Sequence, residues 1–171
     1  MDVYEAIEKR RSVRQWQARP IEAETLRRVM NAARLAPSAK NLQEWRFVVV
    51  TDADTRRDLA AAARGQDFVG QAPAVIVGCA VDTSNTMPCG QQSYPIDLAI
   101  AMDHITLAAV AEGLGTCWVG AFYEDQVKDL LGIPDAVRVV DLMPIGYPTE
   151  APGTPKRRKD YDEAVVMERW R

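Results

Sequence analysis

An apolar segment over residues 95–112 constrains the fold of this chain more than any other feature. Its apolar residues recur at helical spacing and wrap most of the helix circumference: Ile96, Leu98, Ala99, Ile100, Met102, Ile105, Leu107, Ala108, Val110 and Ala111. A helix that is apolar on nearly all sides must be buried on nearly all sides. A single small domain cannot easily cover such a helix, so we expect part of its surface to pack against a second subunit.

Shorter segments on either side of this helix predict the remaining elements. Apolar residues at helical spacing favour helices over residues 2–10, 22–36 and 124–131, and Thr51-Asp52 can cap a further helix toward Arg64. Apolar runs with β-branched residues favour strands over residues 47–50, 75–81, 116–119 and 137–145. Helices before, between and after strands indicate an α+β fold. We expect one domain over residues 1–171, a length within the range of roughly 100–200 residues typical of a single domain.

The cysteine and histidine content argues against a disulfide framework and against a metal site. Cys79, Cys89 and Cys117 are an odd number with no close pair, which fits a reducing compartment. His104 is the one histidine and no Cys-x-x-Cys motif occurs, so the usual ligands of zinc are missing. No apolar run approaches the ~20 residues of a membrane span, and residues 1–5 do not resemble a signal peptide. We therefore expect a cytoplasmic protein with no metal and with neither a membrane nor a nucleic acid as partner.

Two basic clusters stand out in a chain whose formal net charge is -3. One is Arg10-Arg11-Ser12-Val13-Arg14, and the other is Lys156-Arg157-Arg158-Lys159. Arg10 and Arg14 can fork onto phosphate oxygens while the Ser12 hydroxyl donates a third bond. These clusters favour an anionic ligand, although the first cluster alone also fits a solvated run of charges at a helix end.

A second motif supports the anion-binding interpretation. The stretch Ala36-Pro37-Ser38-Ala39-Lys40-Asn41-Leu42-Gln43-Glu44-Trp45-Arg46-Phe47, taken with the first basic cluster, resembles the flavin site of the nitroreductase family. The resemblance continues in family order through residues 72–77, 94–113, 114–122 and 145–148. It implies a mixed central sheet flanked by helices, with the long buried helix at a dimer interface. Glu44 stands where the family usually has proline, which adds a charge near the expected flavin pocket and frees a backbone angle beside Gln43.

The resemblance implies that FMN is held by contacts from both ends of the chain. Arg10, Ser12, Lys156 and Arg158 would hold the FMN phosphate, and Arg11 would join through its backbone. Arg14 would reach the pyrimidine edge of the ring, where a cation stabilises the negative charge of the reduced flavin. Charge-assisted hydrogen bonds are stronger than those between neutral groups, so we expect the contacts to the phosphate to dominate the affinity for FMN.

Contacts to the flavin ring would come from three further segments. Pro37, Ser38 and Asn41 would contact a flavin bound mainly by the other subunit, with Gln43 beside them. Gln66 is a candidate for an amide contact to the ring edge. The Gly120 and Ala121 backbone N–H groups would point at flavin N5 and O4, because small residues let the backbone approach the ring. A plain turn glycine is the alternative for Gly120.

The sequence contains no motif for hydrolysis or for dinucleotide binding. His104 lies in the apolar segment, no Gly-x-Ser-x-Gly occurs, and residues 113–118 lack the third glycine of Gly-x-Gly-x-x-Gly. The chemistry must therefore come from a cofactor, with the protein supplying binding, orientation and electrostatics. No side chain is assigned a catalytic role.

The resemblance implies an FMN-dependent oxidoreductase that passes electrons from NAD(P)H to a nitroaromatic, a quinone or a similar small-molecule acceptor. It also implies a homodimer with two flavins at the subunit interface. Two alternatives remain open: the same fold with a different flavin reaction, such as dehalogenation or flavin fragmentation, and a non-catalytic flavin store or sensor. Residues 82–93 are rich in Thr, Ser, Asn, Pro and Gly and form either a mobile substrate-facing loop or a plain connector.

Overall fold

A four-stranded sheet forms the centre of the computed structural model, which describes residues 1–149 and 157–170. The strands lie in the order β1 (Trp45–Val50), β2 (Ala74–Ala80), β4 (Arg138–Gly146) and β3 (Gly115–Thr116), and each pair is antiparallel. Every residue of β2 is buried, as expected for a central strand covered on both faces.

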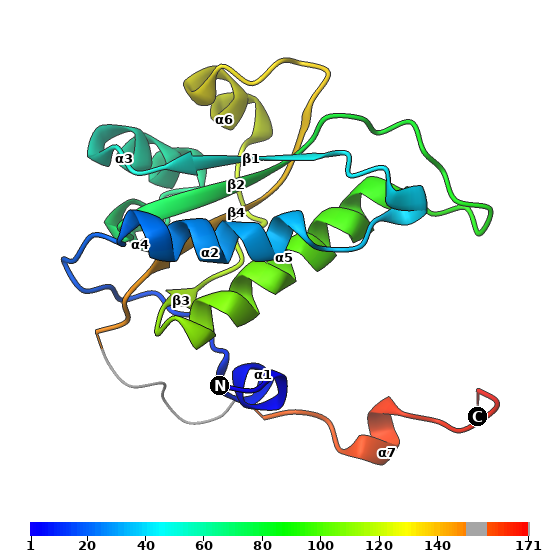
Figure 1. The fold of residues 1–171 in the computed structure, drawn as a ribbon. Helices are drawn as coiled ribbons and strands as arrows, with labels where there is room; N and C mark the ends of the chain where they lie inside the picture. The colour runs from blue at the N-terminus through cyan, green and yellow to red at the C-terminus, as the bar shows by residue number, and fades with distance from the viewer. Residues whose placement is uncertain (150–156, 171) are drawn as a thin grey trace.

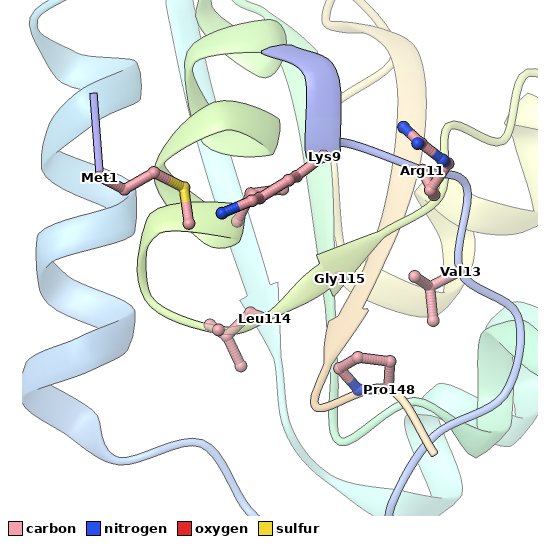
Figure 2. A pocket seen from close by; sticks show the side chains of 9 residues that line it. Met1, Lys9, Arg11, Val13, Leu114, Gly115 and Pro148 are labelled. Atoms are coloured by element: carbon pink, nitrogen blue, oxygen red, sulfur yellow. The ribbon is translucent and has the colours of Figure 1, made fainter. Parts of the chain in front are cut away.

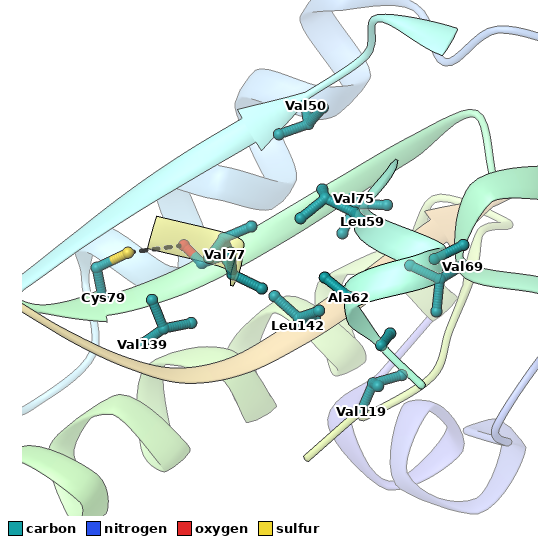
Figure 3. Close-up of a cluster of buried hydrophobic side chains, with 13 residues drawn as sticks. Val50, Leu59, Ala62, Val69, Val75, Val77, Cys79, Val119, Val139 and Leu142 are labelled. Carbon is teal, nitrogen blue, oxygen red and sulfur yellow. Dashed lines mark hydrogen bonds between the residues drawn. The ribbon is translucent and has the colours of Figure 1, made fainter. Parts of the chain in front are cut away.

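Helices cover both faces of the sheet (Figure 1). On one face lie α2 (Ala23–Arg34) and α5 (Ser93–Ala111), whose apolar residues pack with Ile76 and Met143 of the sheet. On the other face lie α3 (Ala53–Ala62), α4 (Asp67–Gln71) and α6 (Glu124–Leu131), which pack with Val75 and Val77. Figure 3 shows this second cluster between β2, β4 and the helices. Odd-numbered and even-numbered residues of β2 point to opposite faces of the sheet because side chains alternate along a strand.

Local signals in the sequence account for several helix ends. Before α1 (Val3–Lys9), Asp2 and Glu5 form a capping box in which each side chain accepts from the other's backbone N–H. Asp52 caps α3 by accepting from the Thr55 N–H. Gly132 ends α6 at a φ of 64°, a left-handed angle that glycine adopts without strain.

The long apolar helix is confirmed as α5, which starts two residues earlier than expected. Leu98, Met102 and Ile105 are almost fully buried against the sheet and α2, whereas the Ile96 side chain is 42% exposed. One side of the helix is thus left uncovered by its own chain.

By length and composition, α5 is the one helix among the described residues that could cross a membrane, which qualifies the expectation that no segment approaches such a span. Core helices of soluble proteins pass the same test.

The α+β fold is confirmed, and the differences from expectation are local. Parallel pairing within the described residues is confined to a bridge between Ser12 and Thr116, so the mixed character of the sheet rests on that bridge. The strand expected over residues 116–119 is interrupted, and Val119 makes a separate bridge to Leu142. Three short helices were not predicted: η1 (Ala39–Asn41), α4 and α7 (Tyr161–Ala164). Each is too short to show helical periodicity.

Candidate functional site

The first basic cluster lies in an extended segment beside β3. Ser12 bridges Thr116, and the Val13 N–H donates to the Thr116 carbonyl at 2.9 Å. Arg11 and Val13 line a cavity of about 180 Å³ between α1, the end of α5 and Pro148 (Figure 2). Because side chains alternate along an extended segment, Ser12 and Arg14 project to the other side.

The Arg11 side chain makes its hydrogen bonds to backbone carbonyls close by in the chain. Its guanidinium donates to the carbonyls of Glu8 and Arg10, the latter at 2.8 Å. This orientation leaves only the backbone of Arg11 for a ligand on the Ser12 side, which is the contact that the resemblance implies.

Arg14 faces the start of α4, where other expected site residues lie. The Arg14 guanidinium lies 5.5 Å from the centre of the Phe68 ring, and the Trp16 Nε1–H donates to the Phe68 carbonyl at 2.9 Å. Two residues away, the Gln66 amide donates to the Ala121 carbonyl at 3.1 Å. The structure thus brings Arg14, Gln66 and Ala121 to one region. Nothing in the sequence indicated the Trp16 contact, which spans 52 residues.

Gly120 borders open space in this region. A Cβ atom built on Gly120 would meet no heavy atom within 4 Å. Since packing within the chain does not demand a glycine here, the absence of a side chain leaves room for a ligand.

A second group of expected site residues surrounds η1. Lys40, Asn41 and Gln43 have φ angles of 52°, 56° and 53°, a left-handed region that residues other than glycine rarely enter. The turn is held by the Ser38 hydroxyl oxygen, which accepts from the Gln43 N–H at 3.0 Å. Left-handed residues of this kind persist where the surroundings enforce them, and they concentrate at functional sites. Pro37, Asn41 and Gln43 are exposed.

Glu44, which stands where the family usually has proline, is buried beneath this turn. Its side chain is 6% exposed, and one carboxyl oxygen accepts from the Ser93 hydroxyl at 2.6 Å. Asp97, one turn further along α5, accepts the Ala39 N–H with both oxygens at 3.1 Å. Glu44 therefore points under the turn toward the start of α5, rather than into a pocket. A charged residue in the apolar α5 segment was the one signal in the sequence for this cluster.

The loop over residues 82–92 lies against the same turn. Lys40 Nζ donates to Asn85 Oδ1 at 3.0 Å, and the Ser93 N–H donates to the Asn85 carbonyl at 3.1 Å. Thr86 and Gln92 bridge across the loop, which leaves Cys89 exposed near its tip. The loop is thus adjacent to expected ring contacts, as a substrate-facing segment would be.

The two groups of site residues lie at opposite ends of α5 (Figure 1). Residues 10–14 pair with β3, which follows the carboxyl end of α5, whereas the turn over residues 38–43 is bonded to Asp97 near its amino end. At about 1.5 Å per residue, the 19 residues of α5 span roughly 28 Å. Much of the length of this helix therefore separates the two groups within one chain.

The second basic cluster is described only in part. Lys156 lies outside the described residues. Arg158 is exposed, and its guanidinium donates to the Arg157 carbonyl at 3.4 Å. All of residues 157–170 are exposed.

The cysteine, histidine and tryptophan side chains outside these two groups differ in burial. Cys79 and Cys117 are buried, and burial raises the pKa of the Cys79 thiol to about 11, so this thiol is unreactive near neutral pH. His104 is half-buried, with Nδ1 3.3 Å from the Ala32 carbonyl. Trp45 packs against the core, while Trp118 is 38% exposed.

Known proteins resemble this chain in both sequence and fold. The model of the nitroreductase family matches residues 7–85 and 61–147. The NADH dehydrogenase of Thermus thermophilus is 32% identical over all of this chain and 97% of its own length. A nitroreductase family protein of Clostridium novyi NT is 37% identical, with a TM-score of 0.84 over 99% of this chain and 95% of that protein. An FMN-dependent nitroreductase of Clostridium difficile R20291 is 28% identical, with a TM-score of 0.85 over 96% and 98%.

Proposed function

Because this chain belongs to the nitroreductase family, we propose that it is a flavin-dependent oxidoreductase that takes electrons from NAD(P)H. The separation of the two groups of site residues is the observation that carries the rest of the proposal. The donor is supported by the Thermus relative, an NADH dehydrogenase, and the cofactor by the FMN-dependent nitroreductase of similar fold.

FMN fits the residues on the Ser12 side of the basic segment. Arg10, Ser12 and Arg14 supply cations and a hydroxyl for a phosphate and for the electron-rich edge of the ring. The open space at Gly120 admits a flat ring close to the backbone of Gly120 and Ala121. When bound, FMN supplies the redox chemistry, since its ring stores and passes on electrons. Arg158 and Lys156 belong to the same phosphate site in this proposal.

The chain's own residues then bind, orient and stabilise charge. A cation at Arg14 favours the reduced, more negative form of the ring and so raises its potential. Backbone N–H groups at residues 120–121 are suited to hold the ring edge at N5 and O4. Gln66, already bonded to the Ala121 carbonyl, holds this loop in place.

Two copies of the chain are needed to complete each site. The turn with Ser38, Asn41 and Gln43 lies at the other end of α5 from the basic segment, and in this proposal a partner copy presents it to the flavin held by Arg14. Exposed apolar side chains beside this turn supply a surface for the partner: Leu35, Leu42, Ile96 and Ala99. We therefore propose a homodimer with two flavins at its interface.

We propose a nitroaromatic, a quinone or a similar electrophile as the acceptor. Donor and acceptor would bind in turn on the same face of the ring, next to the loop over residues 82–92. Stopped-flow reduction of the FMN-loaded protein by NADH and by NADPH, followed by mixing with a panel of acceptors, tests this function. Reduction by neither donor would contradict it and favour a flavin store.

Mixed dimers test the shared site. Arg10→Ala and Asn41→Ala homodimers should each bind FMN poorly. In a mixed dimer, one site carries both defects and the other carries neither, because each site takes Arg10 from one chain and Asn41 from the other. With random pairing, about half of the dimers are mixed and about a quarter of all sites should regain wild-type affinity. No recovery in confirmed mixed dimers would refute the shared arrangement.

A further inference from the structure

Two carboxyl groups meet beneath the turn over residues 38–43. Glu44 is 6% exposed and Asp97 is 4% exposed. Glu44 is bonded to Ser93, one helical turn before Asp97 on α5, which brings the two carboxyl groups together. One Glu44 oxygen accepts from the Ser93 hydroxyl at 2.6 Å, whereas the other, Oε2, is buried without a partner. Asp97 already accepts from the Ala39 N–H with both oxygens.

Their surroundings provide no positive charge to balance the pair. In the part of the chain that the structure describes, no Lys or Arg forms an ion pair with Glu44 or Asp97. The charged residues on the elements packed around them are Lys40 in the turn, Arg46 on β1 and Asp82 in the loop, and all three are exposed. Lys40 is bonded to Asn85, and Asp82 accepts from the Ser84 N–H.

One proton between the two carboxyls would reduce their negative charge and give the unpartnered Glu44 oxygen a hydrogen bond. Two buried carboxylates in contact repel each other, which favours a form of the pair in which Asp97 keeps a proton. Burial raises the pKa of Asp97, and the charge of Glu44 and its hydrogen bond to Asp97 raise it further, against the lowering effect of the Ala39 N–H. A proton between Glu44 Oε2 and Asp97 gives the orphaned oxygen a partner and leaves the pair with a single charge.

We propose that Asp97 holds a proton that it donates to Glu44 Oε2, and that this hydrogen bond holds the turn over residues 38–43 in the shape that contacts the flavin of the partner subunit. The two residues are positioning residues. Asp97 anchors the Ala39 N–H, and Glu44 fixes the chain next to Gln43, whose φ is 53°. Loss of the shared proton puts two buried charges in contact, and their repulsion releases the turn. The contact with flavin rests on the function proposed above, while the shared proton does not.

Hydrogen exchange in the flavin-free full-length protein tests the pair directly. Protection of the peptide over residues 38–44, corrected for the intrinsic rate, is measured from pH 4 to pH 9. In the wild type we expect protection to fall about tenfold to a hundredfold as pH rises, the equivalent of one charge-assisted hydrogen bond. In Glu44→Gln, the amide donates to Asp97 at every pH and still accepts from Ser93, so protection should stay constant.

Internal and matched controls accompany this measurement. The peptide over residues 74–80 in β2 reports global stability, so its pH dependence should be the same in both proteins. Asp103→Asn removes an exposed carboxyl from the same helix and should leave the wild-type profile unchanged. Constant protection in the wild type would overturn the shared proton, as would an equal fall in Glu44→Gln.

FMN binding by the same proteins tests the positioning role. Relative to that of Glu44→Gln, the FMN dissociation constant of the wild type should rise by the same factor over the same pH range. If exchange behaves as expected and FMN binds with an equal pH profile in both proteins, the pair does not position the flavin contact. If neither protein binds FMN while the exchange result holds, the proposed function fails and the shared proton stands.

Discussion

Asp141 makes the stability of this protein fall as pH rises from about 4 to about 7. The residue lies on β4, its side chain is 3% exposed, and neither carboxyl oxygen has a hydrogen-bond partner among the described residues. It faces Gly78 of β2, where a built Cβ would lie 2.8 Å from Asp141 Oδ1 and close to Leu98 and Met102. In this apolar setting, burial raises the pKa of Asp141 to about 7 from an ordinary 3.8.

The sign and size of the effect follow from these two pKa values. Between pH 4 and pH 7 the unfolded chain has released the Asp141 proton while the folded protein keeps it, so the unfolded state gains from each rise in pH. At about 1.4 kcal/mol per pH unit, the contribution of Asp141 to the free energy of unfolding should fall by roughly 4 kcal/mol across this window and then level off.

Urea unfolding at fixed protein concentration, repeated from pH 4.5 to pH 8.5, measures the effect. Asp141→Asn removes the titration and keeps the shape, so any cost of burying the amide is the same at every pH. The difference between wild type and Asp141→Asn should therefore shift against the wild type up to about pH 7. Asp129→Asn, at an exposed position on α6, should show no such shift. A difference that is constant with pH would refute the reasoning.

Three further substitutions test the site. Gly120→Ala should leave the melting temperature of the flavin-free protein unchanged, because its Cβ meets nothing, but should weaken FMN about tenfold in a fluorescence titration if the ring lies there; unchanged affinity would remove Gly120 from the site. Gly115→Ala drives a Cβ into the Val13 side chain and should cost about 1–3 kcal/mol in urea unfolding, relieved by adding Val13→Ala; no relief would exclude this contact as the cause. Arg158→Ala should weaken FMN about tenfold to a hundredfold and riboflavin far less, whereas equal losses would place Arg158 away from the phosphate.

The sequence alone predicted the kind and order of the main elements. The apolar pattern of residues 95–112 predicted α5, and β-branched runs predicted β1, β2 and β4, because periodicity and burial are properties of neighbouring residues. Caps such as Asp52 are equally local. The family could be identified from motifs in order, and the family model confirms it.

Tertiary structure decided where the charged side chains point. Glu44 is buried because Ser93, 49 residues away, donates to it, and no local pattern contains that partner. Asp141 looks like any polar residue in a strand until the packing of α5 over Gly78 removes water from it. The burial of a charge depends on what the rest of the chain places over it, so its protonation follows from the fold.

The division of the site between two chains also depends on the folded structure. The sequence predicted both the basic segment at residues 10–14 and the turn at residues 38–43, since each motif is continuous in the chain. Only the fold shows that the length of α5 separates them. Distance in space is set by how the helices and strands pack, which short motifs do not encode.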